Sequence, residues 1–217
     1  MHAVQDKLIA RGRGGYCFEH NMLMWAVLAQ LGFPVAGLAG RVRWNSPDNG
    51  VRPLGHMALR VEADQQPYLV DVGFGGLTLT APLRLDVGEP QITTLEPFLI
   101  HGGTQRARTL NVLLEGSWRP LYEFEPTEYQ PMDYEAWNWW TCTAPESPFV
   151  AHLMAARPVA NGRHALADNR YTFRPLGGVA HTQVLGTVAE IRGILSNEFG
   201  IAVPESVALD AKLATLI

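Results

Sequence analysis

Cys17 is the residue of this chain whose setting is best suited to chemistry. It follows two glycines, at positions 14 and 15, and stands where an apolar, helix-like pattern begins. Backbone N–H groups at the start of a helix favour negative charge, so a thiolate is stabilised there. We therefore predict a nucleophile at Cys17, although a lone cysteine before a helix is more often a buried packing residue.

A thiol nucleophile needs a base, and the base needs a group that orients it. His56 opens one strand-like stretch and Asp71 closes the next, with turn-forming residues at 63–67 between them. A hairpin that turns at residues 64 and 65 makes His56 and Asp71 diagonal neighbours on one face, roughly 7–8 Å apart at Cα, or directly opposite neighbours if the turn shifts by one pair. The carboxylate would hold one imidazole nitrogen protonated and leave the other facing the thiol. Each residue alone has an ordinary structural explanation, but together they predict a Cys-His-Asp site.

The pattern does not indicate a metal centre or a disulfide framework. The two cysteines, Cys17 and Cys142, lack zinc-type spacing, and the seven histidines are scattered. A reducing, cytoplasmic setting is therefore expected. Cys142 is expected to be a small buried residue.

Composition limits the class of partner. The formal net charge is −4, from 17 Lys and Arg against 21 Asp and Glu, and no basic run indicates nucleic-acid binding. No apolar segment approaches the roughly 20 residues that span a bilayer. The N-terminus lacks the pattern of a signal peptide. The sequence indicates neither the oligomeric state nor the pathway in which the protein acts.

The elements that must position these residues follow from the apolar pattern. Residues 18–31 are apolar nearly all round, which predicts a buried helix that ends at Gly32. A capping box, TVAE at 187–190, predicts a second helix up to Gly200, and a last short helix is expected over 207–216. Short strand patterns predict an antiparallel barrel or sandwich, at 35–44, 56–62, 68–72, 109–114 and 118–124. The Trp- and Pro-rich stretch 126–158 is expected to be irregular.

Three motifs together resemble those of the arylamine N-acetyltransferase family. They are RGGYCFE at 13–19, GHM at 55–57 and DVGFG at 71–75, and their separations also fit; NWWTCT at 138–143 is a further match. The resemblance runs from about residue 4 to about residue 150 and continues weakly to the end. It implies an α+β fold with a partial helical N-terminal domain, an antiparallel β-barrel domain and a C-terminal α/β lid, with a Cys-His-Asp arrangement like that of cysteine proteases.

The resemblance also implies a division into domains. Residues 1–32 would be the remnant of the helical domain, carrying the nucleophile, and 33–125 the barrel, carrying the histidine and aspartate. Residues 126–157 would form an interdomain segment and 158–217 the lid. Family members carry further helices and a Pro-Phe-Glu-Asn motif before the cysteine motif, so an N-terminally shortened member is expected.

The activity implied is acetyl transfer, a reaction of xenobiotic metabolism. Cys17 would be the nucleophile, His56 the base and Asp71 the orienting group. Acetyl-CoA would be a co-substrate, with no permanently bound cofactor, and an arylamine or hydrazine would be the acceptor.

The resemblance also implies substrate contacts, and structural support of the cysteine loop, at individual residues. Phe74 would line the acceptor pocket, and the glycines beside it, Gly75 and Gly76, would let the backbone approach the coenzyme. Arg13 and Glu19 would brace the cysteine loop. Two other functions stay open from the residues: an amidase of the papain or transglutaminase type, and an inactive remnant that only binds ligands.

Overall fold

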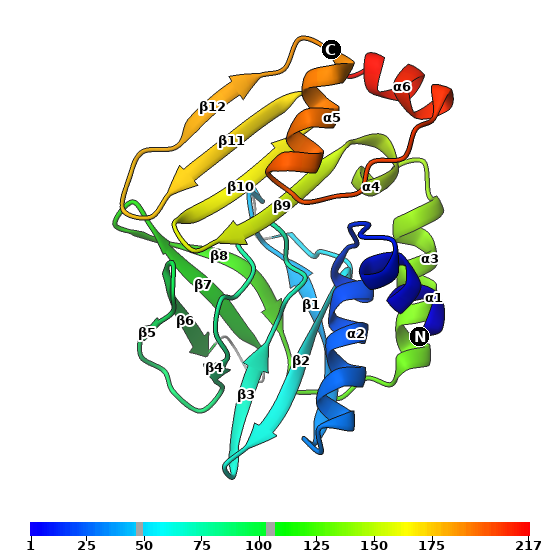
Figure 1. The fold of residues 1–217 in the computed structure, drawn as a ribbon. Helices are drawn as coiled ribbons and strands as arrows, with labels where there is room; N and C mark the ends of the chain where they lie inside the picture. The colour runs from blue at the N-terminus through cyan, green and yellow to red at the C-terminus, as the bar shows by residue number, and fades with distance from the viewer. Residues whose placement is uncertain (47–49, 103–106) are drawn as a thin grey trace. The chain divides into compact units, whose positions relative to one another are not determined.

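The computed structural model describes residues 1–46, 50–102 and 107–217 (Figure 1). The chain forms two units: residues 16–141 are one, and residues 1–15 together with 142–217 are the other. Both contain helices and antiparallel strands, which confirms the predicted α+β class. The division into four domains stays a prediction. Within the described ranges, no helix is both long enough and apolar enough to cross a bilayer.

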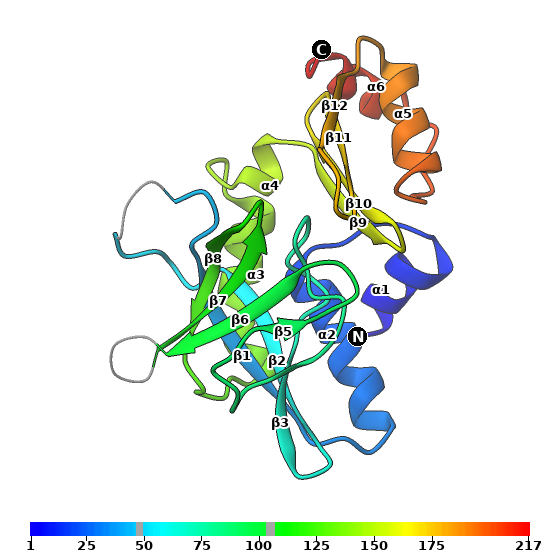
Figure 2. The same ribbon diagram turned by 90° about the vertical axis from the view of Figure 1, so that its left-hand side faces the viewer.

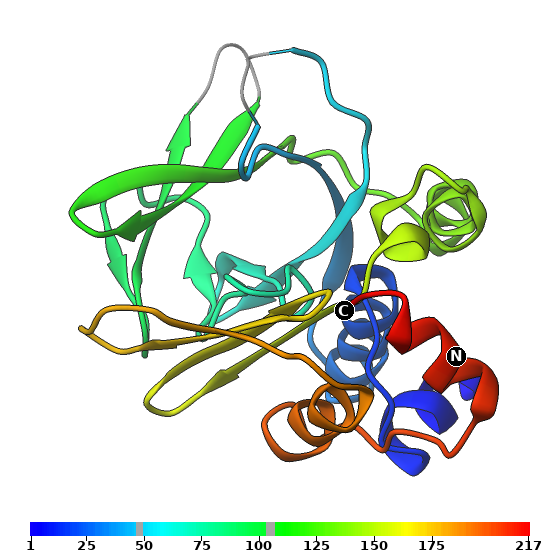
Figure 3. The same ribbon diagram turned by 90° about the horizontal axis from the view of Figure 1, so that it is seen from above.

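The larger unit contains an eight-stranded sheet that curls into a nearly closed barrel (Figure 3). Its strand order is β4-β3-β2-β1-β8-β7-β6-β5. The strands are β1 (Val35–Val42), β2 (His56–Ala63), β3 (Gln66–Val70), β4 (Leu83–Arg84), β5 (Gln91–Ile92), β6 (Pro97–Gly102), β7 (Arg108–Leu114) and β8 (Ser117–Phe124). The side-chain amide of Gln91 joins the two end strands, because it accepts from the Arg84 N–H at 2.8 Å and donates to the Arg84 carbonyl at 2.9 Å.

Strand alternation divides the core of this unit into two layers. In β1, Leu38 belongs to the cluster inside the barrel and Ala39 to the cluster beneath helix α2 (Cys17–Gln30); in β2, Ala58 and Met57 divide in the same way. Helix α2 therefore packs on the outer face of β1 and β2, as Figure 1 shows. It begins and ends within one residue of the predicted helix.

The hairpin of β2 and β3 fixes the relative positions of His56 and Asp71. Its tip residues, Asp64 and Gln65, have φ values of 49° and 62°, the left-handed conformation of a tight hairpin turn. Ala63 pairs with Gln66, which is the register that the turn predicts. His56 is the first residue of β2, and Asp71 directly follows β3.

The stretch 126–158 is more regular than predicted. It contains the 3₁₀ helix η2 (Pro131–Tyr134), α3 (Glu135–Thr143), α4 (Pro148–Ala151) and the start of β9. The expectation of irregular structure was wrong because the aromatic residues that lower helix propensity here gain packing contacts: Tyr134 and Trp137 lie in one cluster with Tyr129. Cys142 is exposed, which corrects its predicted burial.

The other unit is a four-stranded antiparallel sheet with helices on one face (Figure 2). Its core joins α5 and α6 to the sheet. Thr187 caps α5 as the predicted capping box requires, since Glu190 N–H donates to Thr187 Oγ1 at 3.2 Å; the Glu190 carboxylate accepts from Gly186 N–H at 2.7 Å, one residue before the N–H of the predicted box. The elements are α1 (His2–Gln5), the π-helix η1 (Asp6–Ala10), β9 (Met154–Val159), β10 (Gly162–Ala167), β11 (Arg170–Pro175), β12 (His181–Val184), α5 (Val188–Asn197) and α6 (Val207–Ala214).

Candidate active site

Cys17 is the first residue of α2, and only 5% of it is exposed. The loop before it is held at two points. Tyr16 N–H donates to the Glu19 carboxylate at 3.3 Å, and the Tyr16 hydroxyl donates to Asn138 of α3. The Cys17 thiol points at the carbonyl of Gly55, 3.8 Å from the sulfur. The sulfur is thus placed at the N–H end of a helix, beside the residue that precedes His56.

His56 and Asp71 form a buried pair. His56 Nε2 lies 2.7 Å from Asp71 Oδ2, and both side chains are almost fully excluded from solvent. Because the carboxylate occupies Nε2, the other ring nitrogen, Nδ1, is left for the sulfur. Burial alone would lower the pKa of His56, but the charge of Asp71 and hydrogen bonds with Asp71 and Cys17 raise it to about 10.

Asp71 is held from two further sides. Its Oδ1 atom accepts from Gly73 N–H at 2.9 Å and from the Asn21 amide at 3.0 Å. Burial would raise the pKa of this carboxyl, but the charge and hydrogen bond of His56 and these two donors hold it below its ordinary value. Asp71 is therefore a fixed negative charge behind the imidazole.

Sequence reasoning missed Asn21, which has no exposed surface. Its amide donates to the carbonyl of Met57 at 2.7 Å, and its oxygen accepts from Val72 N–H at 3.0 Å. A signal was present: Asn21 lies one turn after Cys17 on the same helix face, as a polar residue in a mainly apolar helix.

Two aromatic rings enclose the imidazole. The ring centroids of Tyr122 and Phe74 lie 4.7 Å and 5.1 Å from that of His56. The Tyr122 hydroxyl meets no described hydrogen-bond partner of good geometry, yet burial first, and then the nearby Asp71, raise its pKa well above the ordinary value. Tyr122 was not predicted, because β8 lies far from the three motifs along the chain.

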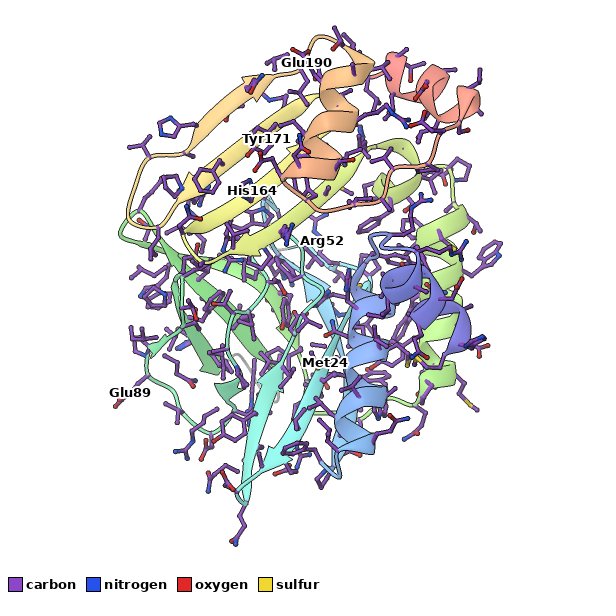
Figure 4. The ribbon with its side chains drawn as sticks, viewed as in Figure 1. Met24, Arg52, Glu89, His164, Tyr171 and Glu190 are labelled. Carbon is purple, nitrogen blue, oxygen red and sulfur yellow. The ribbon has the colours of Figure 1, made fainter. Side chains whose placement is uncertain are left out.

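Arginines of β1 and the loop after it hold the segment that leads to His56. Arg41 donates to the backbone carbonyl of Arg52, a residue that is labelled in Figure 4. Arg43 donates to the carbonyl of Gly50 at 2.6 Å. Gly55 N–H donates to Gly40 O at 3.1 Å. These bonds fix the approach of the chain to the first residue of β2.

The other predicted site residues are placed less decisively. Phe74 packs on His56, and Gly75 has φ +84°, so that turn requires a left-handed residue. Gly76 is exposed. Arg13 belongs to the other unit, so its pairing with Glu19 stays a prediction, as do the substrate contacts.

A cavity of about 440 Å³ lies between α2 and the β2–β3 hairpin. Met24, labelled in Figure 4, lines it from the helix. Asp71 and Val72 line it, but Cys17, His56 and Phe74 are not among its described lining residues. Its walls are mainly apolar: Met24, Leu28, Phe33, Val61, Ala63, Tyr68, Val70, Val72, Leu79, Ala81 and Pro82.

The site offers general-base and nucleophilic chemistry. Among the described residues, no three His, Cys, Asp or Glu side chains gather as metal ligands. A buried thiol, an imidazole and a carboxylate in sequence are the groups that acyl transfer through a covalent intermediate requires.

Comparison with known proteins points in the same direction. The model of the N-acetyltransferase family matches residues 1–208. The arylamine N-acetyltransferase of Mycobacterium tuberculosis is 38% identical over 221 residues, which cover 99% of this chain and 77% of the relative. That of Escherichia coli is 34% identical over 204 residues, covering 93% of this chain and 72% of the relative. The structure of Mycobacterium marinum arylamine N-acetyltransferase in complex with CoA superposes with a TM-score of 0.94 at 38% identity, covering 99% of this chain and 81% of that one.

Proposed function

The chain belongs to the arylamine N-acetyltransferase family, and we propose that it moves an acetyl group from acetyl-CoA to an arylamine or hydrazine through an acetyl thioester on Cys17. The family is one of acyltransferases. The observation that carries the proposal is the orientation of His56: its Nε2 is bound to Asp71 at 2.7 Å, and its other nitrogen is left for the sulfur.

In the first step the Cys17 sulfur attacks the thioester carbonyl of acetyl-CoA. The new carbon–sulfur bond forms as the bond to coenzyme A breaks, and the leaving thiolate takes a proton from His56. In the second step the amine attacks the acetyl-Cys17 carbonyl, His56 accepts the amine proton, and the Cys17 thiolate leaves. Asp71 stays ionised throughout and keeps the ring oriented. The backbone N–H of Cys17 is a candidate donor to the oxyanion of both steps.

The charge state of the site favours this chemistry. With a pKa raised to about 10, His56 is an imidazolium at neutral pH. A cation beside the sulfur stabilises the thiolate, which is both the better nucleophile and a good leaving group. Asp71 stabilises that cation from behind.

The substrate assignments extend the same proposal. The relative solved in complex with CoA supports coenzyme A as the acyl carrier. Phe74 would contact the acceptor, and the turn at Gly75 and Gly76 would approach the coenzyme. Arg13 and Glu19 would brace the cysteine loop. A chain with two cysteines fits a reducing, cytoplasmic setting, and acetylation of foreign amines would be a reaction of xenobiotic metabolism.

The test is direct detection of the acyl-enzyme. Incubation with acetyl-CoA alone should add the mass of one acetyl group to Cys17, and 4-methoxyaniline should remove it with formation of the acetylated amine. Cys17→Ala should abolish both steps, whereas Cys142→Ser, which changes the exposed cysteine, should retain them. Amide hydrolysis that needs no acetyl-CoA would instead support an amidase, and an unacetylated Cys17 would contradict the proposal.

A further inference from the structure

We propose that Asn21 is a positioning residue, which holds the Asp71 carboxylate toward His56 and ties both to the helix of the nucleophile. The inference rests on the proposed acetyl transfer. Asn21 is fully buried, and its amide joins its own helix to two segments that are distant along the chain, so that three segments meet at this side chain. Each of these segments carries or adjoins one of the three reactive residues.

The hydrogen-bond chemistry explains why an amide is needed at this position. The Met57 carbonyl and the ionised Asp71 can only accept, and Val72 N–H can only donate. One side chain must therefore supply two donors and one acceptor in a small plane, which fixes the orientation of the Asn21 amide. Aspartate has the same shape but supplies no donor when ionised, and an aliphatic residue supplies neither donor nor acceptor.

The location of these bonds makes Asn21 a link between neighbours of the reactive groups. It lies one turn after Cys17, its partner Met57 follows His56, and its partner Val72 follows Asp71. The packing allows little adjustment, because a Cβ on Gly73 would stand 2.8 Å from Asn21 Nδ2. The helix start and the end of β3 are thus held together through this one amide.

The electrostatic role of Asn21 follows from the different hydrogen-bond partners of the two carboxylate oxygens of Asp71. Oδ1 takes the Asn21 and Gly73 donors, so Oδ2 is left for His56. The titratable groups that face Asp71 are His56 and Tyr122, with Cys17 beyond the imidazole. Without the Asn21 donor, Oδ1 keeps the Gly73 N–H but loses its second described donor. The carboxylate then binds a proton more readily, so it stabilises the imidazolium less. The Asn21 hydrogen bond is one of the contacts that lower the pKa of Asp71.

The experiment measures the rate of Cys17 alkylation by iodoacetamide against pH in the wild type, Asn21→Asp and Asn21→Ala. Loss of a hydrogen bond to a charged group should move the midpoint of the profile upward by about one pH unit or more. In acetyl transfer, kcat should fall at least about tenfold while KM for acetyl-CoA stays within about twofold. The alkylation profile needs no acetyl-CoA, so it separates failure of this inference from failure of the proposed function.

The matched control is Asn111→Ala in β7. Asn111 also bonds backbone carbonyls with its amide, those of Leu99 and Thr109 at 3.5 and 3.1 Å, but it takes no part in the site. This variant should keep the wild-type pH profile. Asn21 variants that also keep the wild-type profile, and lose activity only in proportion to their unfolded fraction, would overturn the inference.

Asn21→Asp also keeps the inference testable if the Asn21 variants do not fold at neutral pH. In this variant the carboxylates at positions 21 and 71 are neighbours, and they share a proton in mild acid. That proton restores a hydrogen-bond donor between positions 21 and 71. The variant should therefore regain the wild-type near-ultraviolet circular dichroism near about pH 5. If it stays unfolded there, or if it folds and its Cys17 alkylation profile matches the wild type, the inference is wrong.

Discussion

Gly73 lies so close to the start of α2 that a Cβ on it would stand 2.6 Å from the Cα of Cys17. The end of β3 and the start of α2 are therefore in backbone contact, which only glycine permits. The sequence motif suggested a glycine-rich loop that lets backbone approach a ligand. At Gly73 the approach is to the protein itself, so this glycine sets the distance between the sulfur and Asp71.

Gly73→Ala should consequently separate the cysteine from the histidine pair. Overpacking of this kind costs about 1–3 kcal/mol, and acetyl transfer should fall by more than the lost stability explains. Urea unfolding and steady-state kinetics measure the two effects. The control is Gly88→Ala, since a Cβ on that exposed glycine meets no described atom within 4 Å. Equal effects of the two substitutions would contradict the proposed contact.

His56→Gln should slow alkylation of Cys17 by iodoacetamide at neutral pH at least about tenfold, because the thiolate loses its cationic neighbour. Cys142 is exposed, and its rate in the same sample provides an internal reference that should not change. Peptide mapping after timed quenching distinguishes the two thiols. Unchanged selectivity for Cys17 in the variant would show that the imidazole does not activate the sulfur.

The stability of the His56–Asp71 pair should depend on pH with a defined sign. The pKa of His56 is raised from 6.5 to about 10, so its contribution is fully present below about pH 6.5 and is lost as the pH rises through about 10. The pKa of Asp71 is lowered from 3.8, so its contribution is present above that value and is lost in acid.

His56→Gln measures this dependence. Breaking a buried ion pair costs about 3–5 kcal/mol, so the difference in free energy of unfolding from the wild type should be largest near pH 6 and should shrink toward about pH 10. His152→Gln is the control, because it removes a more exposed pair with Asp168, which contributes about 0–1 kcal/mol. A difference for His56→Gln that stays constant between these pH values would exclude the raised pKa.

Tyr122→Phe should be tolerated far better than Tyr122→Ala. The phenyl ring keeps the contacts with His56 and Phe74, and the hydroxyl has no described partner of good geometry. The free energy of unfolding should therefore change by less than about 1 kcal/mol for phenylalanine, but by about 3–5 kcal/mol for alanine. If phenylalanine destabilises as much as alanine, the hydroxyl has a structural partner.

Gln91→Ala should weaken the barrel where its two end strands meet. The amide supplies two hydrogen bonds to the backbone of Arg84, worth about 0.5–1.5 kcal/mol each. Hydrogen exchange at the Arg84 amide should accelerate while that of the central strands stays slow. Gln91→Glu, which can still accept from this N–H, should show the smaller acceleration.

The parts of the site that could be predicted are those that local rules determine. The β2–β3 register follows from the turn at Asp64 and Gln65 together with the two-residue period of strands, so the proximity of His56 and Asp71 was accessible from the sequence. The α2 boundaries follow equally from its apolar pattern and Gly32.

The parts that could not be predicted depend on contacts between distant segments. Tyr122 reaches His56 only because β8 pairs with the edge of β1 opposite to β2. The role of Asn21 depends on the position of Asp71 relative to α2 in the folded chain. Helix α3 was missed because its tryptophans are poor helix formers, and one of them, Trp137, is stabilised there by packing with Tyr129 and Tyr134. Contacts between segments that are distant along the chain decide these positions, and local sequence preferences do not.

The tight tip of the β2–β3 hairpin has a consequence for how such a site can change. Strand side chains alternate between faces, so one extra residue between Asp64 and Gln65, far along the strands from the sulfur, can shift the pairing by a single position. That slip would turn Asp71 away from His56 to the opposite side of the ribbon. An insertion of two residues would preserve the facing. Length changes at this remote tip should therefore be accepted in even steps and eliminated in odd ones.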